Sequence, residues 1–341
     1  MAQSYKKIII KSSNWIGDTI MSTPAINCLR ENFPNAQIDV ICRPWVKEVL
    51  KNNPDINNIF IEEKGIIKNY PLITQIRTAK YDLGVLFPNS FSSALMLWLA
   101  GVKNILGYNR DGRGLLLSKK IKPTKEILEQ HQVEYYYNLV KQICEKDVPK
   151  KLILNLENES KLFIDDLLKQ KGINENDFVV GINPGAFAGS AKRWYPERFA
   201  KVGDYMVEKH NAKIILVGTD KEKPLADKVE EFSQFKNNYF NFAGTLNLQQ
   251  HLCLLNKLKL FYTNDSGSMH MASALDIPIV AIFGGTDWKV TYPYNKNSVM
   301  IRKNTECAPC LLDECPTDHR CMKNITPEDV INATEDFLKI L

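Results

Sequence analysis

Short apolar strands alternate with helical patterns along both halves of this chain, and this alternation limits the possible folds. In the first half we expect strands at 7–11, 36–42, 56–62 and 81–87, and helices near 23–33, 44–52, 70–79 and 126–144. In the second half we expect strands at 177–183, 212–218, 237–244, 258–263 and 277–285, and helices near 196–209, 221–232, 247–256 and 267–275. Such alternation is typical of parallel sheets wound with helices, so the sequence predicts an α/β protein with two Rossmann-like halves.

The length of the chain favours two domains. Its 341 residues exceed what one hydrophobic core usually serves. We place an N-terminal domain at 1–165 and a C-terminal domain at 166–341. A last helix is expected over 326–341, because Thr326 offers a cap and Pro327 suits the first helical turn. A helix in that position could pack back on the N-terminal domain.

Composition points to an ordinary globular protein of the cytoplasm. Apolar residues make up 44% and charged residues 24% of the chain, and the longest apolar run, 93–102, is too short to span a membrane. The start of the chain lacks the apolar core of a secretory signal. The formal charge of +5 is uneven, because residues 1–150 hold 21 Lys and Arg against 14 Asp and Glu. This surplus suggests an anionic partner (nucleic acid, a phosphorylated substrate or an acidic membrane surface), although a merely soluble surface is equally compatible.

Glycine-rich or polar clusters follow the predicted strands. In doubly wound sheets ligands bind beyond the carboxyl ends of the strands, which is where these clusters fall. They are found at 12–18, 87–90, 183–194, 218–222, 243–245, 264–270 and 284–288. Two sheets with these loops facing a central cleft would gather all of them. No GxGxxG fingerprint follows the first strand, which counts against a simple dinucleotide oxidoreductase.

Asp18 in "NWIGDTIMSTPA" is a candidate general base. Gly17 allows a tight turn after the first strand, and Asp18 then stands near a helix start. Its carboxylate could accept a proton at the ligand-binding edge, or it could be the N-cap of the helix. We expect Pro24 in the first turn of the helix at 23–33.

Two segments of the second half have the properties of an anion site. In "NPGAFAGSAKRW" (183–194), Gly185 and Gly189 free the backbone, Lys192 supplies a cation and a helix starts soon after. In "TNDSGSMHMASAL" (263–275), Asp265 and Ser266 are expected to cap a helix, and Gly267 would allow close approach of a phosphate. Asp265 would repel a phosphate and more plausibly bonds a hydroxyl or orients the loop. His270 could donate to a phosphate or serve only in packing.

A basic loop at 106–125 could bind an anionic acceptor. It carries Arg110 and Arg113 near glycines, and arginine binds phosphate in a bidentate manner. Nucleic acid is not expected as the partner, because aromatic residues are few in this segment. A solvated turn is the alternative.

The densest cysteine cluster is Cys307, Cys310, Cys315 and Cys321. Its C-x2-C-x4-C-x5-C spacing is tighter than that of a usual two-knuckle zinc site. We expect a reduced, packed loop, with structural zinc as the alternative, and no catalytic role in either case.

These motifs together resemble glycosyltransferase family 9, the ADP-heptose:lipopolysaccharide heptosyltransferases. The resemblance runs nearly end to end and is carried by "NWIGDTIMSTPA", "FPNSFSSAL", "NPGAFAGSAKRW", "AGTLNL" and "TNDSGSMHMASAL". It implies a GT-B fold and inverting transfer of heptose from ADP-heptose to an anionic inner-core lipopolysaccharide precursor, with heptose II added to heptose I. It also implies that no metal or other cofactor is required, and that the protein contacts the cytoplasmic face of the inner membrane peripherally.

The resemblance also assigns roles to residues. Asp18 is implied as the base and Lys192 as the group on the donor diphosphate. On the acceptor side we place Asn89, together with Arg110 and Arg113 of the basic loop. Asp220 is implied as the acidic residue at the ribose, with Glu222 as an alternative. The remaining donor-side residues implied are Asn183, Gly185, Ser190, Thr245, Asp265, Ser266, Gly267 and His270.

Other functions stay open from the sequence alone. A GT-B transferase or epimerase for another nucleotide sugar would share most of these motifs. A non-catalytic binding protein for nucleotide sugar or lipid A would not need both a basic acceptor loop and a candidate base.

Overall fold

The computed structural model describes residues 4–187 and 189–340, and these divide into two compact units between residues 155 and 156. The division falls at residue 155 rather than 165, the boundary drawn from the sequence. The helix α7 (Asn158–Gln170) packs on α10 (Leu248–Leu255), which accounts for its place in the C-terminal unit. Among the described residues, no helix has the length and apolar character needed to cross a bilayer.

The N-terminal unit is built on a six-stranded parallel sheet in the order β3-β2-β1-β4-β5-β6. Its central strands are buried isoleucine, valine and leucine, as expected for a sheet covered on both faces. The strands are β1 (Lys7–Lys11), β2 (Gln37–Cys42), β3 (Asn58–Ile61), β4 (Leu83–Leu86), β5 (Asn104–Tyr108) and β6 (Lys119–Ile121).

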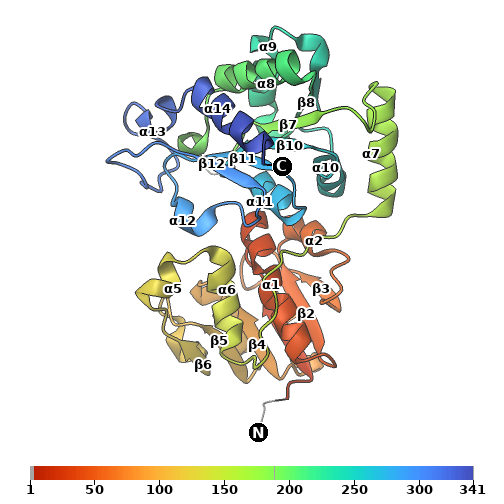
Figure 1. Cartoon of the computed structure of the whole chain (residues 1–341). Helices are drawn as coiled ribbons and strands as arrows, with labels where there is room; N and C mark the ends of the chain where they lie inside the picture. The colour runs from red at the N-terminus through yellow and green to blue at the C-terminus, as the bar shows by residue number, and fades with distance from the viewer. Residues whose placement is uncertain (1–3, 188, 341) are drawn as a thin grey trace. The chain divides into compact units, whose positions relative to one another are not determined.

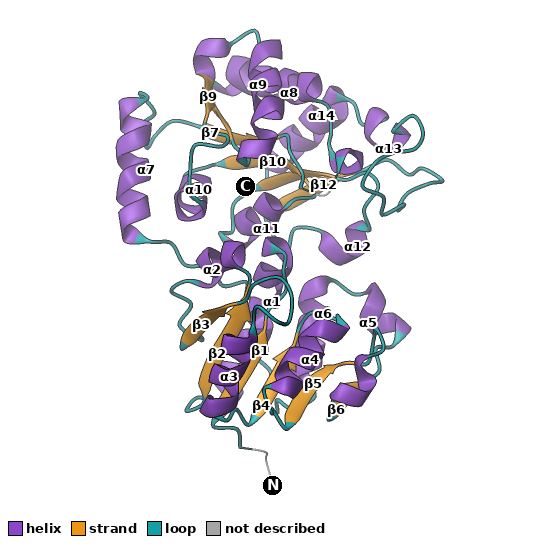
Figure 2. Cartoon of the chain, turned by 180° about the vertical axis from the view of Figure 1, so that it is seen from behind, coloured by secondary structure: helices purple, strands orange, loops and turns teal. Residues whose placement is uncertain are grey.

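Helices cover both faces of this sheet. α1 and α6 lie on one face (Figure 1), and α3 and α4 lie on the other (Figure 2). The helical segments are α1 (Ile16–Asn32), α2 (Pro44–Leu50), α3 (Tyr70–Ala79), α4 (Phe91–Leu99), the short η1 (Arg113–Leu116), α5 (Lys125–Glu129) and α6 (Gln132–Lys141). The prediction of a single helix over 126–144 is therefore wrong, because the helix is interrupted at Gln130 and His131, between α5 and α6. The Nδ1 of His131 accepts a hydrogen bond from the backbone of Val133 and caps α6.

The position of Pro24 is also a correction. We expected it in the first turn of a helix, but α1 begins at Ile16 and Pro24 lies inside it. Proline has no N–H to donate to the carbonyl of Ile20. The hydroxyl of Thr23 donates to that carbonyl at 2.7 Å and supplies the missing hydrogen bond. This side-chain bond explains how the helix tolerates an internal proline.

The C-terminal unit repeats the same topology. Its six-stranded parallel sheet has the order β12-β11-β10-β7-β8-β9, so β7 and β10 hold the places that β1 and β4 hold in the first sheet. The strands are β7 (Val179–Asn183), β8 (Lys213–Leu216), β9 (Tyr239–Asn241), β10 (Leu260–Asn264), β11 (Ile279–Ile282) and β12 (Ser298–Ile301). The two sheets confirm the predicted pair of Rossmann-like domains.

The helices of this unit form two groups. α8 packs with α9 and α14, and α10 packs with α7 and α11 (Figures 1 and 2). The bounds of the helices of this unit, apart from α7 and α10 given above, are α8 (Pro196–His210), α9 (Lys223–Phe232), α11 (Gly267–Ala274), α12 (Trp288–Thr291), α13 (Arg320–Lys323) and α14 (Pro327–Leu338). Thr326 caps α14 in a capping box with Asp329, so the predicted start of the last helix is confirmed, and the helix packs on α8 and β12.

Candidate functional site

The N-terminal unit has its topological switch point between β1 and β4. The strand order reverses there, and in open α/β sheets ligands bind beyond the carboxyl ends of the strands at this point. The segment after β1 leads into α1 with Asp18, and the segment after β4 contains Asn89. The topology therefore positions two of the predicted site residues at the ligand-binding edge of the sheet.

Asp18 lies in the first turn of α1 and is not its cap. The helix begins at Ile16, and its N-cap position is Trp15, so the alternative that Asp18 is the N-cap is wrong. The side chain is half-buried, and its Oδ1 accepts a hydrogen bond of 3.0 Å from the hydroxyl of Tyr136. Tyr136 comes from α6, which packs along α1. The carboxylate is thus held in place by a residue from another helix.

Tyr136 is suited to be a constant hydrogen-bond donor. Its side chain is buried and makes an edge contact with Phe87, with ring centroids 5.2 Å apart. Burial raises the pKa of its hydroxyl well above the usual range, and the charge of Asp18 raises it further. Tyr136 therefore stays protonated around neutral pH and donates to Asp18. No local sequence signal could identify this partner, because it lies 118 positions away from Asp18.

Arg113 is used inside the N-terminal unit, which differs from its expected place on an exposed acceptor loop. It is 0% exposed, and burial lowers its pKa to about 10, so it remains charged at neutral pH. Its guanidinium donates to the backbone oxygens of Tyr108 and Pro88 and, at 3.2 Å, to Oδ1 of Asn89. These contacts favour a role in positioning Asn89. Arg110, in contrast, is exposed.

Asn89 is fixed from two sides. Its Oδ1 also accepts a hydrogen bond of 3.1 Å from the hydroxyl of Tyr135. Tyr135 and Tyr136 are neighbours on α6, so one helix contacts both Asp18 and Asn89. The amide nitrogen of Asn89 is the end of the side chain that these contacts do not use.

The C-terminal unit has the equivalent switch point between β7 and β10. Asn264, the last residue of β10, connects the segments that follow the two strands. Its amide nitrogen donates to the backbone oxygens of Pro184 at 2.9 Å and Gly185 at 3.1 Å, and its Oδ1 accepts from the backbone of Trp194 at 3.0 Å. Asn264 belongs to the motif "TNDSGSMHMASAL", but its bridging role was not predicted.

Lys192 and Asp265 meet at this switch point. The Nζ of Lys192 lies 3.6 Å from Oδ2 of Asp265, which also accepts from the hydroxyl of Thr291 at 3.5 Å. Burial raises the pKa of Asp265, and the charge of Lys192 opposes that shift. We expected Asp265 to bond a hydroxyl or orient the loop, and to cap α11 together with Ser266. The cap is Ser266, and Asp265 instead holds the ammonium group of Lys192.

α11 begins two residues after Asp265. The hydroxyl of Ser266 accepts from the backbone of Met269, which confirms Ser266 as the cap, and Gly267 is the first helical residue. His270 is 5% exposed, and burial lowers its pKa to about 4, with a further contribution from Lys192. Within the described part of the chain, its buried Nδ1 has no hydrogen-bond partner. His270 is thus neutral at pH 7 and keeps one ring nitrogen available for a ligand or a water molecule.

Glu222 packs closely against the backbone at Gly185. A Cβ atom on Gly185 would lie 2.3 Å from Oε1 of Glu222, so only glycine fits there beside the carboxylate. The other oxygen, Oε2, accepts from the backbone and hydroxyl of Thr219 in a capping box. Asn183 Oδ1 accepts from the backbone of Gly185. Of the two acidic candidates for the ribose, Asp220 is exposed and Glu222 is buried among these groups.

Ser190 and Thr245 are the two remaining predicted donor-side residues. Both are exposed; Ser190 starts a 3₁₀ turn that also contains Lys192, and Thr245 donates to the backbone oxygen of Phe242. Ser190 is thus two residues from the central cation of the site.

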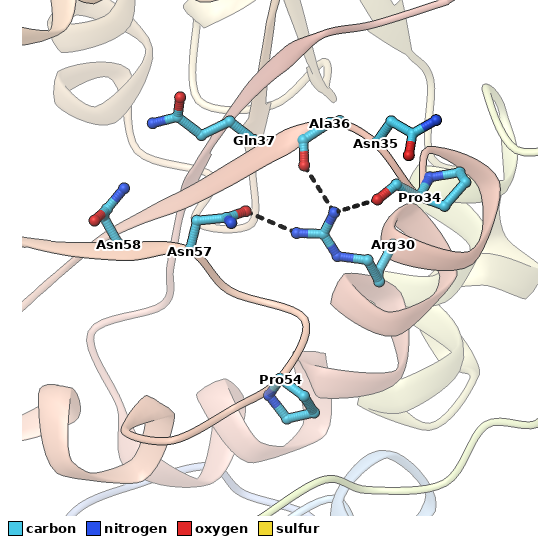
Figure 3. A pocket seen from close by; sticks show the side chains of 8 residues that line it. All are labelled: Arg30, Pro34, Asn35, Ala36, Gln37, Pro54, Asn57 and Asn58. Atoms are coloured by element: carbon cyan, nitrogen blue, oxygen red, sulfur yellow. Dashed lines mark hydrogen bonds between the residues drawn. The ribbon is translucent and has the colours of Figure 1, made fainter.

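A hollow of about 740 Å³ in the N-terminal unit lies away from these residues (Figure 3). It is lined by Arg30 at the end of α1 and by the segments that lead into β2 and β3, hence at the amino ends of the strands. Arg30 donates there to the backbone oxygens of Pro34 and Ala36 and to Oδ1 of Asn57 (Figure 3). Because the arginine is engaged in holding the chain, we attach no site to this hollow.

Three comparisons with known proteins agree on one family. Residues 70–320 match the family model described as glycosyltransferase family 9 (heptosyltransferase). The chain is 31% identical to lipooligosaccharide heptosyltransferase 2 of Campylobacter jejuni, over 98% of each chain. It matches the solved structure of E. coli ADP-heptose lps heptosyltransferase II with a TM-score of 0.82 and 28% identity, over 97% of this chain and 98% of that one. A family 9 structure from Veillonella parvula matches with a TM-score of 0.91 at 22% identity, over 100% and 99% of the chains, and supports the fold alone.

Proposed function

This chain belongs to glycosyltransferase family 9, and from that premise we propose that it transfers heptose from ADP-heptose to the inner core of lipopolysaccharide. The proposed product carries a second heptose on the first, in line with the names of the Campylobacter and E. coli relatives. The observation that carries the proposal is the placing of Lys192, Asp265 and the start of α11 together at the switch point of the C-terminal unit.

The C-terminal unit offers what a departing nucleotide diphosphate needs. Free N–H groups at a helix N-terminus attract anions, and α11 has such an N-terminus here. Lys192 adds a positively charged side chain next to it. Asp265 orients the ammonium group, and the unpartnered Nδ1 of His270 is a further polar contact for the donor. In this proposal these fixed groups meet the charge that develops on ADP, so no metal ion is required for the transfer.

The N-terminal unit offers the base. In an inverting displacement a carboxylate takes the proton of the acceptor hydroxyl as that oxygen attacks the anomeric carbon, and the bond to the ADP oxygen breaks. Asp18 is at the end of the sheet where acceptors are expected, and Tyr136 keeps its carboxylate oriented. We propose that the amide of Asn89 and the exposed Arg110 bind the acceptor, and that Arg113 positions Asn89.

The test of this function is direct. The protein is incubated with ADP-heptose and a panel of truncated core acceptors, and the masses of the products are measured. Addition of one heptose, without any need for added Mg²⁺, is the expected result. Transfer only from another nucleotide sugar, or protection against thermal unfolding by UDP but not by ADP, would point to the alternative GT-B enzymes. Donor binding without turnover would indicate a binding protein.

We also propose that the N-terminal unit lies on an anionic membrane surface, where a lipid-anchored acceptor is presented. Large apolar side chains are exposed on α4 and on two segments that flank it, α3 with its preceding loop and η1. α3 and α4 lie side by side on one face of the unit (Figure 2). The exposed side chains are Ile67 (86%), Tyr70 (69%), Phe91 (47%), Trp98 (54%) and Leu115 (96%). Aromatic and aliphatic residues on a positively charged unit are typical of membrane-surface contact.

Binding to vesicles tests the membrane contact. Sedimentation with vesicles that contain anionic lipid should bring down the wild-type protein, and the double variant Trp98→Ser, Leu115→Ser should bind more weakly. Leu162→Ser is the matched control, since Leu162 is an exposed leucine of α7 in the other unit. Equal binding of all three proteins would contradict the surface proposed here.

A further inference from the structure

The cysteine loop, residues 305–321, surrounds a small cavity with four sulfur-bearing residues. The cavity has a volume of about 80 Å³, and Cys307, Cys310, Cys315 and Cys321 all line it. All four are free thiols; Cys307 is exposed, Cys310 and Cys315 are half-buried and Cys321 is buried. Four cysteines from a stretch of 15 residues therefore line one cavity of the C-terminal unit.

We propose that these four cysteines bind one thiophilic divalent metal ion such as zinc, as a structural site. Structural zinc sites are closed, tetrahedral and often made of four thiolates, and the ligands commonly come in C-x2-C pairs such as Cys307 and Cys310. Among the described residues, no three cysteine, histidine or acidic side chains stand close enough to hold an ion as placed. Binding thus involves turning the thiols into the cavity that they line.

The surroundings of the cysteines suit such a site. The hydroxyls of Thr305 and Thr317 lie 3.9 and 3.5 Å from the sulfurs of Cys307 and Cys315, where they can support thiolates by hydrogen bonds. His319 also lines the cavity, but its ring nitrogens contact the Tyr195 hydroxyl and the backbone oxygen of Ala191. The ligand set we propose is therefore four thiolates without the histidine.

The cysteine loop is bonded to the segment that carries Lys192. The backbone N–H of Ala191 donates to the oxygen of Asp313 at 3.0 Å, and Nε2 of His319 lies 3.0 Å from the oxygen of Ala191. A Cβ atom at Gly189, where φ is +72°, would lie 1.8 Å from the same Asp313 oxygen, so the two backbones touch at a glycine. An ion that fixes the cysteine loop would consequently fix residues 189–192.

A second segment is held in the same way. The backbone N–H groups of Cys310 and Leu311 both donate to the oxygen of Gly285, at 3.0 and 2.9 Å. Gly285 follows β11, the strand beside β10 in the sheet. The proposed ion would thus tie two of the loops at the carboxyl ends of the strands to one rigid point. The metal site itself does not depend on the proposed heptose transfer.

Metal binding by the full-length reduced protein tests the proposal. The metal content of the purified protein is measured, the protein is stripped with a chelator, and Co²⁺ is titrated while the visible absorption of tetrahedral cobalt thiolate is followed. The variants Cys307→Ser and Cys310→Ser each remove one proposed ligand. Cys253→Ser is the matched control, because Cys253 is a buried thiol of α10 in the same unit and outside the cavity.

We expect one ion per chain for the wild type and for Cys253→Ser. Each ligand variant should bind the ion more than about 100-fold more weakly, beyond the 10- to 100-fold loss that removal of an outer-shell partner typically causes. Amide hydrogen exchange in residues 189–194 should slow when the ion binds to the wild type and should not respond in Cys307→Ser. The proposal is overturned if the wild type, with its thiols shown to be reduced, binds no ion, or if the ligand variants bind it as the control does. It is also overturned if the cobalt spectrum lacks the thiolate bands.

Discussion

The hydroxyl of Tyr136 lies 3.0 Å from Oδ1 of Asp18 and connects the first turn of α1 to α6. The pKa of Tyr136 is raised by burial and by the charge of Asp18, so the proton stays on the tyrosine. This hydrogen bond restricts the rotation of the carboxylate, which bears on the role of base that we propose for Asp18.

Replacement of Asp18 by asparagine should abolish transfer and leave ADP affinity nearly unchanged. Loss of a general base commonly costs about 10²- to 10⁴-fold in rate, whereas the diphosphate contacts we propose lie in the other unit. Steady-state kinetics and calorimetric titration with ADP measure the two quantities separately. A parallel loss of ADP binding would show that Asp18 acts through the structure of the protein.

Tyr136→Phe should lower the rate of transfer roughly tenfold or more, because a hydrogen bond to a charged group is lost. Tyr135→Phe removes a hydroxyl from the same helix, but that hydroxyl contacts Asn89. A rate that stays unchanged in Tyr136→Phe, or that falls equally in Tyr135→Phe, contradicts this role.

Lys192→Ala should reduce both ADP affinity and turnover, with a cost of about 10²- to 10³-fold in rate. The same change leaves the buried Asp265 without its cation, so the free energy of unfolding should fall as well. Lys201→Ala, at an exposed lysine of α8, is the control for removal of a positive charge. The double variant Lys192→Ala, Asp265→Asn should be more stable to urea than Lys192→Ala alone. If it is not, the pairing of Lys192 with Asp265 is contradicted.

Arg113→Ala should unfold the N-terminal unit more easily, by about 2–4 kcal/mol, since the carbonyl oxygens of Tyr108 and Pro88 lose their buried donor. Arg110→Ala should change the stability by no more than about 0.5 kcal/mol, because Arg110 is exposed. Its effect should instead be a higher KM for the acceptor. Denaturant unfolding and acceptor kinetics of the two variants distinguish a positioning arginine from a binding one.

His270 should make the protein less stable in mild acid. Its pKa is about 4 in the folded protein and near 6.5 when unfolded, so between these values the unfolded chain binds the extra proton. The contribution is fully present above pH 6.5 and is lost as the pH falls toward 4, at up to about 1.4 kcal/mol per pH unit. His270→Gln should show a smaller slope of unfolding free energy against pH over this window, and an unchanged slope would contradict the shifted pKa.

The sheets could be predicted from the sequence because their central strands are continuous apolar runs. β5, β6 and β12 were not predicted. β6 and β12 are edge strands that are short and only partly apolar, as "KKI" and "SVMI" show, and β5 (Asn104–Tyr108) overlaps the segment that was interpreted as a basic loop. The interruption of the helix at Gln130 and His131 was not predicted, because residues on both sides of it favour helix. The start of α1 was predicted too late because proline is expected only in the first turn of a helix. The hydroxyl of Thr23 supplies the hydrogen bond that Pro24 cannot make, and helix propensities do not take such a side-chain bond into account.

The candidate site was predictable in part, for a topological reason. Loops after parallel strands meet at one edge, so the motifs that contain Asp18, Asn89, Lys192 and Asp265 could be assigned to such edges without a structure. Which atoms pair could not be assigned: Tyr136 with Asp18, or Asn264 with Pro184, are contacts between segments far apart in the sequence. The burial of Arg113 could not be predicted either, because the sequence of a basic loop does not distinguish a buried arginine from an exposed one.

The shared strand order of the two sheets places an acidic and a basic residue after equivalent strands. β1 and β7 occupy equivalent places; the segment that leaves β1 carries the acidic residue Asp18, and the segment that leaves β7 carries the basic residue Lys192. The proton acceptor that we propose and the cation thus lie on separate copies of one scaffold, so substitutions in the segment after β1 should leave the cation after β7 in place.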